Sequence, residues 1–344
     1  MYVAPRPLLA DDPWFAVRLA VLCVVCFAAV QWIRPVFPAL IVSLPIGLLA
    51  AQRKRFDPFL AVAAGGAFIV SIWLMTLIVE LTRETPVLLL STAFGIFTAA
   101  FYVIRRSGSP VGMLLLVAAA IMSIMGLKNP ALLFAFRDGF TQAAILGTVA
   151  IPVLYWIIPP ASSHPHVRIP AVAEDHHGAG SLIRASVLML LCFWLYAVMP
   201  ASDMILAFAA IYVLVFPTGE QAFAEAKERS LATAYGTLAA LIILVAVAWV
   251  GHFALLLCLV ALAGLFFGLR MMHGYHPSMV YQYALSVTVA LVASALSNQS
   301  PAYAAIMRIL LTSSGAIAAA VLVAVLDSLL LSKPERTARQ PSLG

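Results

Sequence analysis

Long apolar runs, separated by short polar or proline-containing segments, follow one another along nearly the whole chain. Each run is close to the roughly 20 helical residues that cross a hydrocarbon core of about 30 Å. We therefore expect an all-α membrane protein of about twelve transmembrane helices. The predicted spans are residues 15–33, 36–51, 58–80, 86–104, 110–126, 137–158, 182–199, 203–217, 230–250, 253–269, 278–296 and 305–331.

The longest polar interruption of this pattern runs over residues 159–181 and contains several histidines. It divides the chain into a first half, residues 1–158, and a second half, residues 182–344, which ends in a short tail. Histidines in such a segment could take up a metal ion. A solvated cytoplasmic linker is the commoner explanation, so we predict no metal site.

Two stretches of the sequence share the spacing P-A-x5-R-x3-T. The first contains Arg137 and Thr141, and the second contains Arg308 and Thr312, with every matched position 171 residues later. Looser matches at similar offsets pair Arg18 with Arg184, Cys26 with Cys192, and Gly65 with Gly236. Because each predicted half holds an even number of spans, both copies enter the membrane from the same side. The pattern predicts two parallel six-helix repeats around a central path, although duplication could also merely enlarge a structural bundle.

Composition agrees with a lipid environment. Apolar residues make up 64% of the chain and charged residues 10%, with a mean hydropathy of +1.04, which is more apolar surface than a water-soluble domain of this size can bury. The net charge of +6 comes from short clusters at helix ends, which argues against a nucleic-acid surface. All four cysteines lie in apolar runs, so we expect no disulfide framework.

The distribution of Lys and Arg predicts the orientation. With the N-terminus in the cytoplasm, fifteen of these residues lie on the inner side and five on the outer side, which accounts for all 20. Cytoplasmic loops are enriched in Lys and Arg. We therefore expect a multi-pass protein with both termini cytoplasmic, and we interpret the first apolar run as a retained span because it is too long for a signal peptide.

The repeated arginines are the main candidates for a substrate path. An Arg within a span is costly unless it reaches water, a headgroup or a partner, and Thr141 and Thr312 share a helix face with Arg137 and Arg308. The two arginines could face one central path and bind an organic anion. Snorkelling to outer headgroups is the competing explanation.

Other candidates lie near the membrane boundaries. Asp138, Asp203 and Asp327 are candidates for proton coupling, although each could simply be solvated. Tyr281 and Tyr283 lie near two histidines at the inner start of a span. They form either an aromatic belt or a stacking surface for a planar substrate.

The sequence lacks a Walker-type phosphate loop, an H-E-x-x-H motif and a G-x-S-x-G motif, whose residues carry nucleotide, metal and acyl-transfer chemistry. We therefore predict no catalytic residues and no cofactor. This absence favours a secondary transporter over an enzyme or an ATP-driven pump.

Two six-span halves, each with an Arg in the outer part of its sixth helix, resemble the fusaric acid resistance and aromatic acid exporter family of bacterial inner-membrane proteins. The resemblance covers roughly residues 15–331. It implies proton-driven export of small, mainly aromatic, organic anions or toxic organics from the bacterial inner membrane. It also implies a periplasmic adaptor protein and an outer-membrane channel as partners, with homo-oligomerisation left open. A passive channel or a membrane scaffold subunit is the alternative function.

Overall fold

The computed structural model describes residues 12–51, 57–108, 110–161, 177–198, 214, 219–295 and 301–330. Over these residues all regular secondary structure is helical. The helices are α1 (Phe15–Ile33), α2 (Pro38–Ala51), α3 (Pro58–Thr82), α4 (Pro86–Ser107), α5 (Pro110–Lys128), α6 (Pro130–Ile157), α7 (His177–Val198), α10 (Gly219–Val250), α11 (Phe253–His273), α12 (Ser278–Ala295) and α13 (Pro301–Leu330).

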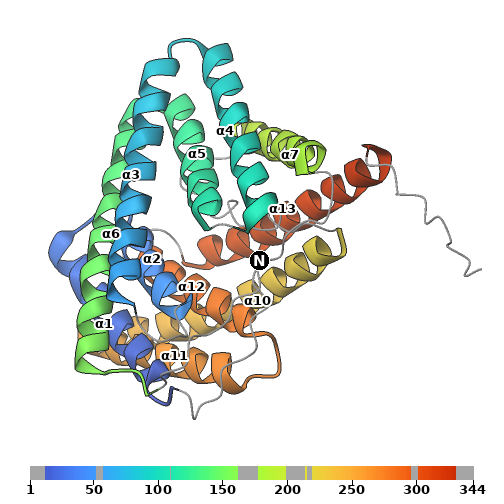
Figure 1. Ribbon diagram of the computed structural model, residues 1–344. Coiled ribbons are helices and arrows are strands. Elements are labelled where there is room, and N and C mark those ends of the chain that lie inside the picture. The colour runs from blue at the N-terminus through green and yellow to red at the C-terminus, as the bar shows by residue number, and fades with distance from the viewer. Residues whose placement is uncertain are drawn as a thin grey trace, which may run out of the picture.

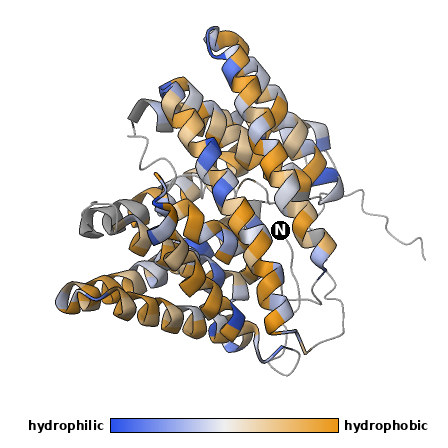
Figure 2. Cartoon of the chain, turned by 90° about the vertical axis from the view of Figure 1, so that its left-hand side faces the viewer, coloured by the Kyte–Doolittle hydropathy of each residue, from blue (hydrophilic) through white to orange (hydrophobic). Residues whose placement is uncertain are grey.

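Ten of these helices are long and apolar enough to cross a membrane, and α2 is a shorter apolar helix. The prediction of an all-α protein with many membrane spans is thereby confirmed. The predicted span 203–217 lies outside the described residues except for Leu214, as does most of the segment 159–181. Figure 2 shows that most of the helix surface is hydrophobic, as contact with lipid requires.

Proline sets the start of many helices. Six of the described helices begin with Pro, a residue that fits the first helical turn because its missing N–H is not needed there. At α6 the preceding Asn129 adds a cap, since its side chain accepts a hydrogen bond from the Ala131 N–H at 2.9 Å. The helix therefore begins at Pro130, seven residues before the predicted start of this span.

The helices gather around two apolar cores. One core contains residues of α3, α4, α5, α7 and α13, and the other contains residues of α1, α11 and α12, while α2, α6 and α10 contribute to both. Figure 1 shows α3, α4, α5 and α6 running side by side and crossing α10 to α13 at a steep angle. Each core thus combines helices from before and after residues 162–176.

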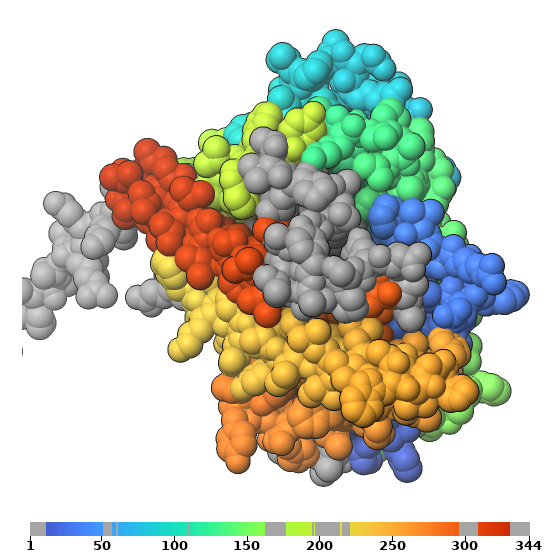
Figure 3. Space-filling view, turned by 180° about the vertical axis from the view of Figure 1, so that it is seen from behind, coloured from blue at the N-terminus to red at the C-terminus, as the bar shows by residue number. Residues whose placement is uncertain are grey.

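Helices that are distant in the sequence pack closely against each other. α1 packs on α11, α4 packs on α7, and α13 contacts both α10 and α7. Figure 3 shows α13 between α7 and α10 from behind. Small residues allow the α1–α11 approach: a Cβ on Gly264 or Gly268 would lie 2.8 or 2.9 Å from the Cα atoms of Ala20 and Ala16. Small residues spaced four apart commonly mediate such close packing in membranes.

Candidate functional site

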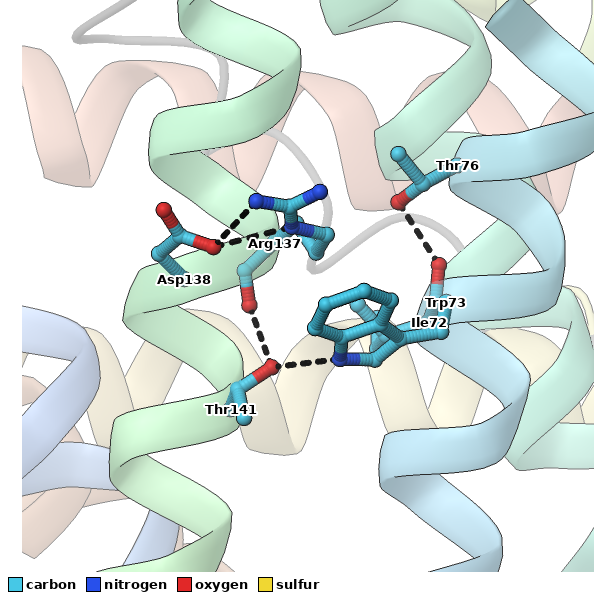
Figure 4. Close-up of polar contacts among 6 residues, drawn as sticks. All are labelled: Ile72, Trp73, Thr76, Arg137, Asp138 and Thr141. Carbon is cyan, nitrogen blue, oxygen red and sulfur yellow. Dashed lines mark hydrogen bonds and ion pairs between the residues drawn. The ribbon is translucent and has the colours of Figure 1, made fainter.

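Arg137 lies on α6 within a cluster of polar and aromatic side chains (Figure 4). Its guanidinium Nη2 lies 2.8 Å from Asp138 Oδ1. The central carbon of this guanidinium, Cζ, lies 4.4 Å from the ring centre of Trp73 on α3 and 5.1 Å from that of Phe134. The Trp73 indole Nε1–H donates a hydrogen bond to Thr141 Oγ1 at 3.1 Å, and the Thr141 hydroxyl donates to the Arg137 carbonyl at 2.7 Å.

The predicted pair Arg137 and Thr141 is therefore joined by Trp73, which the sequence did not single out. Arg137 lies seven residues after the start of α6, about 10 Å along the helix at 1.5 Å per residue. Its side chain is 22% exposed, whereas that of Asp138 is 54% exposed. The cluster places a cation against aromatic rings at an accessible surface, an arrangement that can attract an anion with a planar apolar part.

The second copy of this motif is only partly described. α13 contains Arg308, but its side chain lies outside the described residues, and so does the proton-coupling candidate Asp203. Thr312 is buried on α13. Whether the two arginines share a path stays a prediction.

The two candidate tyrosines contact different neighbours. Tyr281 is buried, and its hydroxyl accepts a long hydrogen bond of 3.4 Å from the backbone N–H of His276. A Cβ on Gly274 would lie 2.2 Å from the Tyr281 ring, so a glycine there makes room for it. Tyr283 instead lies under Arg229 of α10, with 3.9 Å between guanidinium carbon and ring centre. A role for the two tyrosines in stacking a planar substrate stays a prediction.

Asp327, the remaining proton-coupling candidate, is ion-paired. Its Oδ2 lies 3.2 Å from Nη2 of Arg184 on α7, and the Arg184 side chain is fully buried. Arg184 also donates to the Gly180 carbonyl at 3.1 Å. The Arg105 guanidinium from α4 packs on Gly180, where a Cβ would lie 2.6 Å from its Nη2. Asp327 thus joins α13 to α7 beside the end of α4.

A related contact exists around Arg18, which the offset of the repeat had paired with Arg184. Arg18 is buried, forms an ion pair with Asp12, and donates to the Ile158 carbonyl at 3.0 Å. Its guanidinium also lies over the Tyr155 ring at 4.5 Å. Burial raises the pKa of the Asp12 carboxyl, and the Arg18 charge opposes this shift. Arg18 and Arg184 each tie a helix start to the end of a later helix, α6 and α13 respectively.

The structure reveals an ion pair that the sequence analysis missed. Glu225 Oε1 and Arg229 Nη2 of α10 lie 2.8 Å apart, and both side chains are buried. The predicted span begins at residue 230, so both residues fall between the predicted spans 203–217 and 230–250. Their spacing of four residues, which places them on one helix face, is the signal that could have identified the pair.

Two apolar hollows lie in the described part of the chain. One apolar void of about 20 Å³ lies among α4, α5 and α7. An open apolar groove of about 640 Å³ lies where α10 meets the start of α11. Among the described residues, no group of three or more His, Cys, Asp or Glu side chains could hold a metal ion.

Comparison with known families identifies the second half of the chain. Residues 190–322 match the model of the fusaric acid resistance protein-like family. This match supports the predicted family. No curated protein and no solved structure matches the chain significantly. Together with ten candidate spans, the fusaric acid resistance protein-like match supports a multi-pass membrane transporter.

The part that matches the fusaric acid resistance protein-like family contains some of the candidate residues and not others. It includes the Glu225–Arg229 pair and both tyrosines, as well as Arg308 and Thr312. It does not include the Arg137 cluster or Asp327. The family match therefore covers the Glu225–Arg229 pair directly, whereas the Arg137 cluster lies outside it.

Proposed function

We propose that this protein exports small organic anions, with aromatic carboxylates as the main class, across the bacterial inner membrane. The observation that carries this proposal is the Arg137 cluster, in which a guanidinium within a span lies against Trp73 and Phe134. A carboxylate can pair with the guanidinium while an aromatic ring packs against the indole. Arg308 and Thr312 would supply a matching group from the second half.

The helix contacts support two repeats in this proposal. α1 packs on α11, and α4 packs on α7. Gly268 lies against Ala16 in the first pair, and Gly180 lies against Arg105 in the second. The repeat offset of 166 residues relates the two contacts. Adding it to Ala16 gives position 182, close to Gly180, and subtracting it from Gly268 gives position 102, close to Arg105. In this arrangement the first helix of each half, α1 or α7, packs against a helix of the other half. Such an exchange would explain why each core combines helices from both halves.

Export against a gradient requires an energy source, and the proton gradient is the one that this proposal names. Asp138, Asp203 and Asp327 are the proposed proton-coupling residues, with Asp327 favoured because it already joins α13 to α7 through Arg184. A periplasmic adaptor protein and an outer-membrane channel complete the proposed export route. The fusaric acid resistance protein-like match supports this assignment.

The test uses purified protein in vesicles loaded with benzoate. We expect replacement of both arginines, Arg137→Gln with Arg308→Gln, to reduce benzoate efflux at least tenfold, because loss of a charge-assisted contact costs about 1.5–3 kcal/mol. Arg83→Gln is the matched control. Arg83 is a partly exposed Arg just beyond α3 that pairs with the neighbouring Glu84, and its replacement should leave efflux unchanged.

Normal efflux by the double variant, at equal protein incorporation, would remove the arginines from the proposal. A protonophore separates the proposed exporter from a passive channel. Accumulation of benzoate that collapses with the protonophore supports proton-driven export, whereas flux that only follows the benzoate gradient indicates a channel. A protein that moves no benzoate-like anion in either assay contradicts the proposed function.

A further inference from the structure

A row of buried polar side chains runs along one face of α10. Its members, spaced four residues apart, are Glu225, Arg229, Thr233 and Thr237, with exposures of 6%, 6%, 2% and 3%. Residues four apart lie one above another on a helix, so the row extends about 18 Å at 1.5 Å per residue. We call these four residues the α10 polar row.

At one end of the α10 polar row, contacts with neighbouring side chains fix the position of the Arg229 guanidinium. Glu225 binds one edge of the Arg229 guanidinium, and the ring of Tyr283 on α12 lies against its face. The Thr233 hydroxyl donates to the Arg229 carbonyl at 2.8 Å. A planar group held both at an edge and on a face is well oriented for binding a carboxylate.

The other end of the row contains a hydroxyl whose hydrogen-bonding capacity is not used. A helical Thr commonly donates to the carbonyl four residues earlier, as Thr233 and Thr76 do. The Thr237 hydroxyl is buried and has no hydrogen-bond partner among the described residues. Leaving such a group unpaired costs about 1–3 kcal/mol. A bound solute or water at this position would satisfy it.

A purely structural role explains the row poorly. A buried ion pair rarely stabilises a protein more than well-packed apolar residues of similar size, and ionisable residues within membrane helices usually mark transport paths. α12 packs on α10 beside the row, since a Cβ on Gly236 would lie 2.4 Å from the Ala284 carbonyl of α12. The Thr288 hydroxyl of α12 reaches back to the Gly236 carbonyl at 3.0 Å.

We propose that the α10 polar row lines the inner part of the transport route, and that Arg229 binds the carboxylate of the transported organic anion. A guanidinium presents five N–H donors in one plane, so a carboxylate can bind beside Glu225 while the apolar part of the solute contacts Tyr283. Thr233 and Thr237 then continue the route along α10. This inference rests on the proposed function, because it takes an organic anion as the cargo.

The first experiment measures access to the row. The native cysteines Cys23, Cys26, Cys192 and Cys258 are replaced by Ala, and Thr237→Cys is introduced. We expect a charged, membrane-impermeant methanethiosulfonate to label this variant, and saturating benzoate to slow labelling about tenfold, since an occupied site excludes the reagent. Ala119→Cys is the matched control, because Ala119 is also buried but lies on α5, away from the α10 polar row, and it should stay unlabelled.

The second experiment tests Arg229 itself. Arg229→Gln should raise the KM for benzoate efflux about tenfold or more, because the charge-assisted hydrogen bonds to the benzoate carboxylate are lost. The single variant leaves Glu225 without its cation and could misfold. The double variant Glu225→Leu with Arg229→Met removes both charges, and we expect it to fold normally while benzoate no longer protects Thr237→Cys from labelling.

The outcomes separate the two proposals. If wild-type protein exports benzoate but Thr237→Cys is never labelled, the route along α10 is wrong. If Thr237→Cys is labelled but benzoate gives no protection, the assignment of Arg229 to the anion is wrong. If wild-type protein exports no benzoate at all, the proposed function itself fails.

Discussion

α3 and α10 carry the matched glycines Gly65 and Gly236, yet they bury different chemistry. α3 buries an apolar face that includes Phe68, Ile72 and Val79. α10 buries the polar row from Glu225 to Thr237 along a comparable length of helix. Apolar packing is what a helix needs to stay in place, whereas a buried polar row costs desolvation energy. Under the proposed repeat, the two helices would be copies that keep one packing position, and only α10 would carry the polar residues of the proposed transport route.

Removing one charge from α10 should have the largest effect on stability. Glu225→Leu or Arg229→Leu alone leaves its partner as an uncompensated buried charge, which typically costs about 3–5 kcal/mol. The double replacement should cost much less than the sum of the two single replacements. Denaturant unfolding in detergent micelles measures these differences. Additive losses would show that the two residues do not act as a pair.

At the start of α3 the corresponding change should be small. Asp57 is exposed, and its carboxylate accepts a hydrogen bond from the Phe59 N–H at 3.0 Å. We expect Asp57→Ala to cost about 1 kcal/mol, as for loss of a helix cap. A loss as large as that of the α10 single variants would contradict the contrast between the two helices.

The matched glycines should also respond differently to added volume. A Cβ on Gly236 meets the backbone carbonyl of Ala284 at 2.4 Å, whereas a Cβ on Gly65 meets the hydroxyl of Thr148 at 2.0 Å. A side-chain hydroxyl can rotate away, but a helix backbone cannot. We expect Gly236→Ala to cost about 1–3 kcal/mol and Gly65→Ala less, as compared by melting temperature. Equal losses would mean that the α3–α6 contact is as rigid as the α10–α12 contact.

Two threonines should give changes of opposite sign. Thr237→Val removes a buried hydroxyl that has no described partner, so stability should rise by up to about 1 kcal/mol while benzoate efflux falls. Thr76→Val on α3 breaks the hydroxyl's bond to the Ile72 carbonyl and should lower stability by about 1 kcal/mol. Unfolding and efflux are measured on the same preparations. Unchanged efflux for Thr237→Val would leave the row without a role in transport.

Arg137 should contribute least to stability. Its partner Asp138 is more than half exposed, and exposed ion pairs are worth about 0–1 kcal/mol. Arg137→Gln should therefore unfold within about 1 kcal/mol of the wild type. A much larger loss would indicate that the Trp73 contact buries the guanidinium more deeply than the geometry suggests.

Most of the helical architecture could be predicted because the bilayer fixes the length of a span and prolines mark many helix starts. The start of α10 could not. The sequence alone indicates a polar connection between spans at Glu225, Glu228 and Arg229. The helix extends through them because α12 and α13 cover that face and Glu225 neutralises Arg229.

Contacts between distant segments were the other gap in the prediction. The sequence predicted Arg137 and Thr141 on one helix face, but Trp73 lies 68 residues from Thr141. Arg184 and Asp327 are 143 residues apart. Helix periodicity shows which side chains share a face and gives no information on which helix will cover it. The Arg18–Arg184 match did carry a usable signal, since both arginines hold helix ends together.

The packing of α1 on α11 has a consequence for biosynthesis. The small-residue face of α1 around Ala16 and Ala20 finds its partner only once Gly264 and Gly268 have been synthesised. α4 likewise must wait for α7. α1 and α4 can therefore pack on α2 and α5 soon after synthesis, but each lacks one of its final packing partners until α11 or α7 has entered the bilayer.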